Sequence, residues 1–109
     1  MNMKQRIDWD NLGFNAHQTK SMYIAKFDSN GKCFDNGLVP YGDIKLSPAA
    51  TVLNYGQGVF EGTKAYETSK KRVVFFRLND NAKRFNNSCL RLCMPGIPHE
   101  MFVNAVKET

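Results

Sequence analysis

Long apolar runs, CxxC pairs and histidine clusters are all missing from this sequence of 109 residues. No apolar run approaches the roughly 20 residues that a transmembrane helix needs, so we expect no membrane partner. The first ten residues, MNMKQRIDWD, lack the apolar segment of a secretory signal. The two histidines, His17 and His99, lie far apart in polar surroundings, and no metal-ligand spacing occurs, so we predict no metal site.

Cysteine is scarce and odd in number. Cys33, Cys89 and Cys93 indicate free, mostly buried thiols in a reducing compartment. Cys89 and Cys93 are four residues apart, so they would lie on one helix face, and a regulatory thiol pair is the alternative. Neither a Ser/His/Asp nor a Cys/His arrangement can be argued from the spacing, so we assign no catalytic residue.

The composition is that of one globular domain, because 42% of the residues are hydrophobic and 23% are charged. The net charge of +5 suits nucleic acid, anionic cofactors or acidic substrates. However, the basic residues are scattered, and their one cluster, SKKR at 69–72, lies where a hairpin turn is expected. We therefore predict a solvated loop tip there and no nucleic-acid partner.

The first half of the chain predicts an arm followed by a hairpin. Residues 1–20 are polar, with three isolated apolar anchors at Trp9, Leu12 and Phe14. The alternating pattern of 21–28 predicts a strand. Asn30-Gly31 is a strong turn signal, and residues 33–42 predict an interrupted strand or an edge loop, since they hold two glycines and a proline.

A short helix is expected over about 48–55, with Ser47 as its N-cap and Gly56 as its stop. The runs VFEGTKAYE and RVVFFRL then predict two strands joined by TSKK, which makes a second hairpin.

Two helices are expected after the second hairpin. The first covers 81–93, is capped by Asn79 or Asp80, and ends before Pro95. Its buried face comprises Ala82, Phe85, Cys89 and Leu92. The second begins near Pro98, and its apolar residues are Phe102, Val103 and Val106. Strands followed by helices indicate an α+β domain over 21–109, with an antiparallel sheet and flanking helices.

The stretch LNYGQGVFEGTKAY contains three close glycines, Gly56, Gly58 and Gly62. Their G-x-G-x-x-x-G spacing is one residue off the dinucleotide-binding fingerprint, and they precede a predicted strand instead of following one. No G-K-[ST] follows, so the stretch is not a P-loop either. The glycines provide positive φ angles for tight turns, or their missing side chains let a ligand approach the backbone.

Three further residues could carry chemistry. Arg84, early in a predicted helix, either binds a phosphate or lies on a solvated face. Glu61 is either a buried carboxylate with a raised pKa or a structural group held by hydrogen bonds. Tyr55 and Tyr66 face a cavity or belong to the core. From the residues alone, we predict an α+β domain with a possible anion site.

Two separated motifs resemble one known family. LSPAATVLNYGQGVFEGTKAY and FFRLNDNAKRFNNSCLRLCMP are similar to segments of the branched-chain amino acid aminotransferases, which are fold-type IV pyridoxal-phosphate enzymes. MYIAKFDSNGKCFDNGLVPYGDIKLSP resembles the plant-like members most closely. The resemblance covers about residues 20–109 and implies the small N-terminal α+β domain of such an enzyme.

The resemblance assigns roles to four residues. Arg84 in NAKRFNNS matches the arginine that grips the phosphate of pyridoxal 5'-phosphate. Phe60 and Gly62 in VFEG match positions that line the substrate pocket. Tyr55 matches a tyrosine that reaches the site of the partner subunit, which implies a homodimer.

The implied reaction transfers an amino group between leucine, isoleucine or valine and 2-oxoglutarate. In the family, the lysine that attaches the cofactor lies in a larger C-terminal domain, beyond position 109, and no lysine here, Lys64 and Lys83 included, matches its motif. We therefore expect the 109 residues to be inactive alone. A non-catalytic domain, a D-amino acid aminotransferase and an aminodeoxychorismate lyase are the alternatives. An intracellular location follows, either cytoplasmic or organellar if a transit peptide has been removed.

Overall fold

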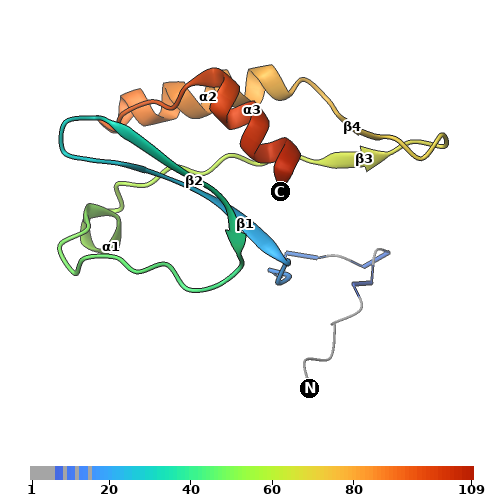
Figure 1. The fold of residues 1–109 in the computed structure, drawn as a ribbon, viewed down its shortest axis with the longest axis horizontal. Helices are drawn as coiled ribbons and strands as arrows, with labels where there is room; N and C mark the ends of the chain where they lie inside the picture. Colours follow the sequence, from blue (N-terminus) through green and yellow to red (C-terminus); the bar gives the residue numbers. More distant parts are fainter. Residues whose placement is uncertain (1–6, 9, 12, 15) are drawn as a thin grey trace.

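The computed structural model describes residues 7–8, 10–11, 13–14 and 16–109. In chain order the elements are β1 (Ser21–Phe27), β2 (Cys33–Pro40), α1 (Thr51–Tyr55), β3 (Ala65–Glu67), β4 (Val73–Phe75), α2 (Leu78–Arg91) and α3 (His99–Glu108). The strands form two antiparallel pairs, β1–β2 and β3–β4, with helices beside them (Figure 1). This confirms the α+β class, although the strands form two small sheets instead of one.

The N-terminal arm is described only in part. Two of its three predicted anchors, Trp9 and Leu12, lie outside the described residues. The third, Phe14, is fully exposed and therefore does not anchor the arm. The boundary near residue 20 stays a prediction.

The turn between β1 and β2 forms where Asn-Gly predicted it. The Asp28 carboxylate accepts hydrogen bonds from the backbone N–H of Asn30 at 2.9 Å and of Lys32 at 2.8 Å. Gly31 takes a positive φ of 75°, a conformation that costs little without a Cβ. A short polar side chain and a glycine thus set the register of the whole hairpin.

The interruption expected in the returning strand is a β-bulge. The register shifts between Ile24 and Ala25, which pair with Gly37 and Asp35. Gly37 has a φ of 68°, and its N–H donates to Asp35 Oδ1 at 2.8 Å. The strand continues past the bulge to Pro40, so the pattern predicted the irregularity but not the length of β2.

The second hairpin is shorter than the sequence suggested. Residues 59–64 were expected to belong to its first strand, but β3 includes only Ala65–Glu67. Within 59–64, Glu61 and Gly62 accept hydrogen bonds from side chains of α2. Polar contacts to a helix therefore take the place of strand pairing in this segment.

Three predicted caps differ from the structure. Ser47 does not cap α1: its hydroxyl accepts from the N–H of Ala49 at 3.2 Å, in a turn that precedes the helix. Neither Asn79 nor Asp80 caps α2, because this helix begins earlier, after Arg77, which takes a left-handed φ of 53°. The predicted stop at Gly56 is confirmed, with a φ of 62°.

The core lies between α2 and α3. Ala82 and Cys89 of α2 and Phe102 of α3 are buried, and the rings of Phe85 and Phe102 lie 5.6 Å apart at 43°. Leu92, predicted for the same face, is 39% exposed because α2 ends at Arg91.

The alternative of a thiol pair on one face of α2 does not fit the structure. Cys89 is buried, whereas Cys93 lies beyond the end of α2, is exposed and has a positive φ of 54°. Since the two side chains do not share a helix face, the idea of a regulatory pair is wrong. Cys33, Cys89 and Cys93 are free, as predicted, but they are not mostly buried, since Cys33 is half-buried and Cys93 is exposed.

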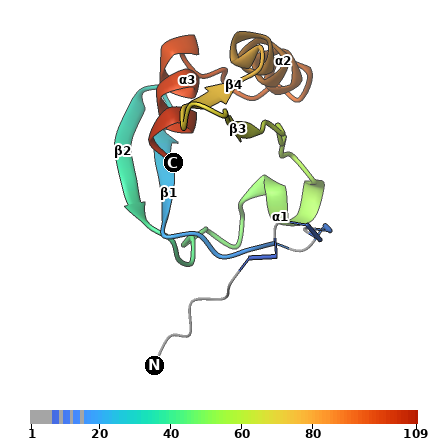
Figure 2. The same ribbon diagram turned by 90° about the vertical axis from the view of Figure 1, so that its right-hand side faces the viewer.

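The elements do not pack into two full layers. From the side, the β1–β2 hairpin, the α2–α3 pair and α1 follow one another around a ring (Figure 2). An apolar groove of 690 Å³ runs between β1 and α3, and Tyr23, Phe27, Phe85, Met101 and Val106 contribute to its lining. No helix among the described residues is long and apolar enough to cross a membrane.

Candidate anion-binding site

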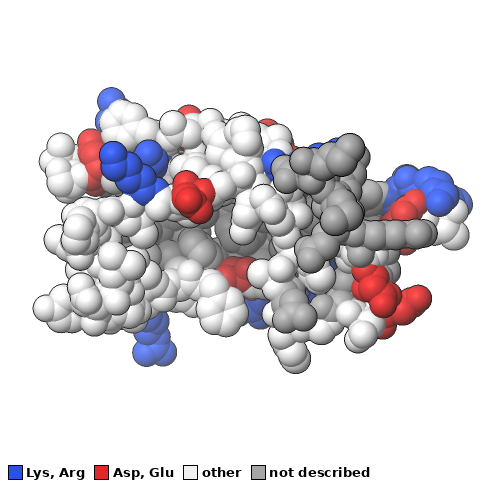
Figure 3. Space-filling model, turned by 90° about the horizontal axis from the view of Figure 1, so that it is seen from below, with Lys and Arg blue, Asp and Glu red and all other residues white. Residues whose placement is uncertain are grey.

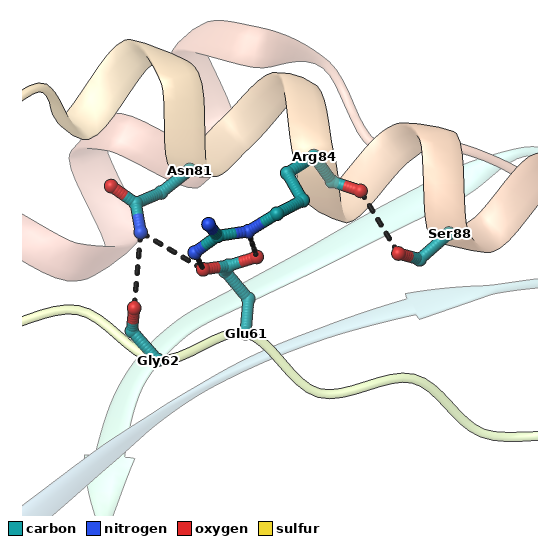
Figure 4. A network of polar contacts seen from close by, with 5 residues as sticks. All are labelled: Glu61, Gly62, Asn81, Arg84 and Ser88. Atoms are coloured by element: carbon teal, nitrogen blue, oxygen red, sulfur yellow. Dashed lines mark hydrogen bonds and ion pairs between the residues drawn. The ribbon is translucent and has the colours of Figure 1, made fainter.

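Glu61 and Arg84 form the main polar contact of the domain (Figure 4). Arg84 Nε donates to Glu61 Oε2 at 2.8 Å, and Arg84 Nη2 donates to Glu61 Oε1. Asn81 Nδ2, one turn earlier on α2, donates to the same Oε1 at 2.9 Å and to the Gly62 carbonyl at 3.0 Å. Two side chains of one helix therefore hold the segment that carries Glu61.

The contacts keep Glu61 ionised despite its burial. Its side chain is only 5% exposed, which by itself would raise the pKa of the carboxyl. The hydrogen bonds from Arg84 and Asn81 outweigh burial and lower the pKa of Glu61 from 4.5 to about 2. The same contact raises the pKa of Arg84. Glu61 is thus a structural carboxylate, and the alternative of a raised pKa for acid–base work is wrong.

Arg84 keeps part of its hydrogen-bonding capacity. Its side chain is 67% exposed, and among the described residues Nη1 has no hydrogen-bond partner. In Figure 4 this nitrogen points away from Glu61. One edge of the guanidinium is therefore occupied by a carboxylate, and its outer end is open to a ligand.

Arg84 also lines a polar groove of 630 Å³. Its lining residues are Gly62, Thr63, Lys64, Tyr66, Phe76, Arg77, Asp80, Asn81 and Arg84. Arg77 is already paired with Asp80 at 2.6 Å. The groove is thus lined by three cations, two of which are paired with carboxylates, Arg77 with Asp80 and Arg84 with Glu61, so a positive charge remains that favours an anionic ligand.

The other basic cluster is separate from this groove. Seen from below, basic side chains gather at the end of the molecule where the β3–β4 turn lies, and elsewhere on this face they are dispersed (Figure 3). Lys70, Lys71 and Arg72 are exposed in this turn, and Lys71 Nζ lies 3.3 Å from Glu67 Oε1. The prediction of a solvated loop tip is confirmed.

The structure brings together two of the four predicted site residues. Gly62 and Arg84 line the same groove, linked through Asn81. Tyr55, at the end of α1, and Phe60 do not line it, and they are 84% and 93% exposed. Their assigned roles stay predictions. For Tyr66 a cavity and the core were the two alternatives, and the structure places it in the lining of the groove, 53% exposed.

The three glycines of the motif serve different purposes. Gly56 provides the positive φ that ends α1. At Gly58 the space is limited, because an added Cβ would lie only 3.0 Å from Val52 Cγ2 and would crowd it. At Gly62 φ is not positive and an added Cβ would meet nothing within 4 Å. The backbone at Gly62 therefore does not require a glycine, and its assigned place in the substrate pocket stays a prediction.

The sequence reasoning missed Asn81, Lys64 and Arg77 as members of the site. One signal was present: Asn81 and Arg84 are three residues apart in a predicted helix, so they lie on the same face. Lys64 and Arg77 carried no comparable signal, because a chain reversal at the β3–β4 hairpin brings them to one groove. Among the described residues, no group of three or more His, Cys, Asp or Glu side chains could hold a metal ion.

Comparison with known proteins assigns the family. No protein-family model matches the chain. It is 46% identical over 103 residues to branched-chain-amino-acid aminotransferase 2, chloroplastic, of Arabidopsis thaliana, and 49% identical over 104 residues to branched-chain amino acid aminotransferase 2, chloroplastic, of Humulus lupulus. Each match covers 94% of the chain. The chain belongs to the branched-chain-amino-acid aminotransferase family.

The aminotransferase relatives are much longer than this chain. It spans 26% of the Arabidopsis protein, 25% of the Humulus protein and 30% of a branched-chain-amino-acid aminotransferase of Helicobacter pylori, to which it is 41% identical over 104 residues. The expectation of an N-terminal part of such an enzyme, close to the plant members, is confirmed. Since the matches extend over 103 and 104 of the 109 residues, they include the segment with Glu61, Gly62 and Arg84.

Proposed function

We propose that this chain is part of a transaminase that moves the amino group between leucine, isoleucine or valine and 2-oxoglutarate. The observation that carries the proposal is the guanidinium of Arg84, which Glu61 holds by two hydrogen bonds in a groove that Lys64 and Arg77 also line. The names of the relatives favour this reaction over those of D-amino acid aminotransferases and aminodeoxychorismate lyases.

The groove fits the phosphate of pyridoxal 5'-phosphate. Arg84 offers the outer end of a planar, permanently charged fork, which suits a phosphate dianion. Lys64 adds a second cation to the lining, and Thr63 lies beside it in the chain. When bound, the cofactor supplies an electron sink for the carbanion formed from the amino acid. The task of this chain is to bind and orient.

The remaining predicted residues would recognise the substrate. Phe60 supplies an exposed aromatic ring, which suits the aliphatic side chain of a branched-chain amino acid. Gly62 leaves space for a ligand at the rim of the groove. The exposure of Tyr55 suits a side chain that reaches into a second subunit of a homodimer.

The location of the protein is proposed from its relatives. Those of Arabidopsis thaliana and Humulus lupulus cited above are named chloroplastic, and others from the same plants are named mitochondrial. We propose an organelle, and imaging of the tagged natural protein tests this.

Replacement of Arg84 tests the proposed function. In the natural polypeptide, Arg84→Ala should weaken the binding of pyridoxal 5'-phosphate by about 2–3 kcal/mol, the value of a charge-assisted contact. Absorbance titration with the cofactor measures the affinity. Arg91→Ala is the matched control, because Arg91 is exposed on the same helix but does not line the groove. Unchanged affinity in Arg84→Ala would rule out the phosphate role.

The 109 residues by themselves should show no transaminase activity, since none of their lysines matches the cofactor-binding lysine of the family. A leucine-dependent assay of the purified chain, with 2-oxoglutarate and added cofactor, measures this. Measurable turnover would contradict the prediction.

A further inference from the structure

We propose that Glu61 is a positioning residue for anion binding: it holds the guanidinium of Arg84, a lining residue of the polar groove, in one orientation. The inference rests on the proposed phosphate role of Arg84. It concerns a carboxylate, a group that would ordinarily oppose the binding of an anion.

Arg84 needs an external restraint. Its side chain is long and two-thirds exposed, so in the absence of a partner it would sample many rotamers. A ligand that binds a mobile side chain must order it, and this lowers the affinity. The two hydrogen bonds to Glu61 remove that cost before the ligand arrives.

Glu61 is itself well fixed. Its carboxylate is almost fully buried, and Asn81 holds both Glu61 Oε1 and the next carbonyl, that of Gly62. Asn81 and Arg84 project from neighbouring turns of α2 toward the same segment (Figure 4). The chain of contacts therefore leads from a rigid helix, through Glu61, to the orientation of Nη1.

Electrostatics and positioning make opposite predictions. If Glu61 affected binding only through its charge, its neutralisation would leave Arg84 more attractive to an anion, and affinity would rise. If Glu61 orients Arg84, neutralisation weakens the bidentate contact, and affinity falls. The sign of the change thus separates the two.

The experiment measures binding of pyridoxal 5'-phosphate and of inorganic phosphate to the natural polypeptide and to Glu61→Gln. We expect both affinities to fall by about tenfold, as when an outer partner that orients a ligand-binding group is lost. The NMR signal of the Arg84 Nε–H should also exchange faster with water in this variant. Because Glu61→Gln is also expected to be less stable than the natural protein, binding is compared under conditions in which both are fully folded. A role in folding alone would then leave the affinities unchanged.

Asp80→Asn is the matched control, since Asp80 lines the same groove but pairs with Arg77 and not with Arg84. This variant removes the same charge, and we expect tighter binding, not weaker. Glu61→Asp keeps the charge but shortens the reach, so it should bind the probes more weakly than the natural protein. This variant decides the question if Glu61→Gln fails to fold.

The outcomes are distinct from those of the proposed function. Suppose that Glu61→Gln binds the two probes as tightly as the natural protein, or more tightly, while Arg84→Ala binds them weakly. This result overturns the positioning role of Glu61 and leaves the phosphate role of Arg84 intact. Unchanged binding in Arg84→Ala overturns the phosphate role itself. In the Arg84→Ala background, Glu61→Gln should cause no further loss, because there is no guanidinium to orient.

Discussion

At the scale of single residues, Glu61 illustrates how a buried charge is tolerated. A carboxylate removed from water is costly unless charged and polar groups replace its hydration. Arg84 and Asn81 do so with three hydrogen bonds to its two oxygens. Because these contacts favour the ionised form, the folded state should depend on pH through this residue.

The pKa of Glu61 is about 2 in the fold and 4.5 for the free group, so the folded state binds this proton more weakly than the unfolded chain. The stabilisation is fully present above pH 4.5 and is lost as the pH falls from 4.5 to about 2. We expect the free energy of unfolding to decrease over this window.

Denaturant titrations of the natural chain and of Glu61→Gln, from pH 7 to pH 2, measure this dependence. The natural chain should be more stable near neutral pH, and the difference should shrink toward pH 2. A difference that stays constant over the whole range would contradict the assignment.

At the scale of elements, α1 is the least supported helix. It has five residues, none of them buried. Gln57 connects it to the rest of the fold: its Nε2 donates to the Leu92 carbonyl at 2.8 Å, and its Oε1 accepts from the Thr51 hydroxyl at 2.5 Å. Helix α1 therefore depends on its left-handed stop at Gly56, which aims Gln57 at the end of α2.

Gly56→Ala should destabilise α1 by about 1 kcal/mol, since an alanine is strained at a φ of 62°. Amide hydrogen exchange in α1 should become about fivefold faster, which corresponds to that free energy. Gly42→Ala is the control, because Gly42 does not have a positive φ and an added Cβ would meet nothing within 4 Å. Equal exchange rates in the two variants would contradict the explanation.

At the scale of the whole molecule, the chain buries little apolar surface. The buried hydrophobic residues among those described are Leu78, Ala82, Cys89 and Phe102. The radius of gyration is 16.0 Å, against roughly 13 Å for a compact domain of this length. The apolar groove beside β1 adds to the exposed surface.

We expect the 109-residue chain to bind an apolar dye such as ANS and to self-associate, because exposed apolar surface favours both. Added salt should increase association, since it screens the repulsion of a net charge of +5. Dye fluorescence and sedimentation velocity measure these effects.

Ala65 lines the apolar groove, so Ala65→Lys should lower dye binding. Ser69 lies in the β3–β4 turn, outside the lining of this groove, so Ser69→Lys should not. A monodisperse chain that binds no dye would contradict the expectation.

Most local features could be predicted from the sequence. The Asn-Gly turn, the stop at Gly56, the buried positions Ala82 and Cys89 and the half-buried Phe85 follow from backbone preferences and helical period. Several of the predictions that were wrong concern element ends. The caps at Ser47 and Asn79 or Asp80 were misplaced because α1 begins later than expected and α2 earlier, with Arg77 in a left-handed conformation.

The sequence by itself determined the hairpins, the helices and the family, because turn residues, apolar period and motif spacing are all local properties. Only the tertiary structure decided the site. Glu61 and Arg84 are 23 residues apart, and their contact depends on how residues 59–64 lie against α2. The same packing pairs one edge of the Arg84 guanidinium with Glu61 and leaves its other end open. The division of the strands into two sheets is also a property of the tertiary structure.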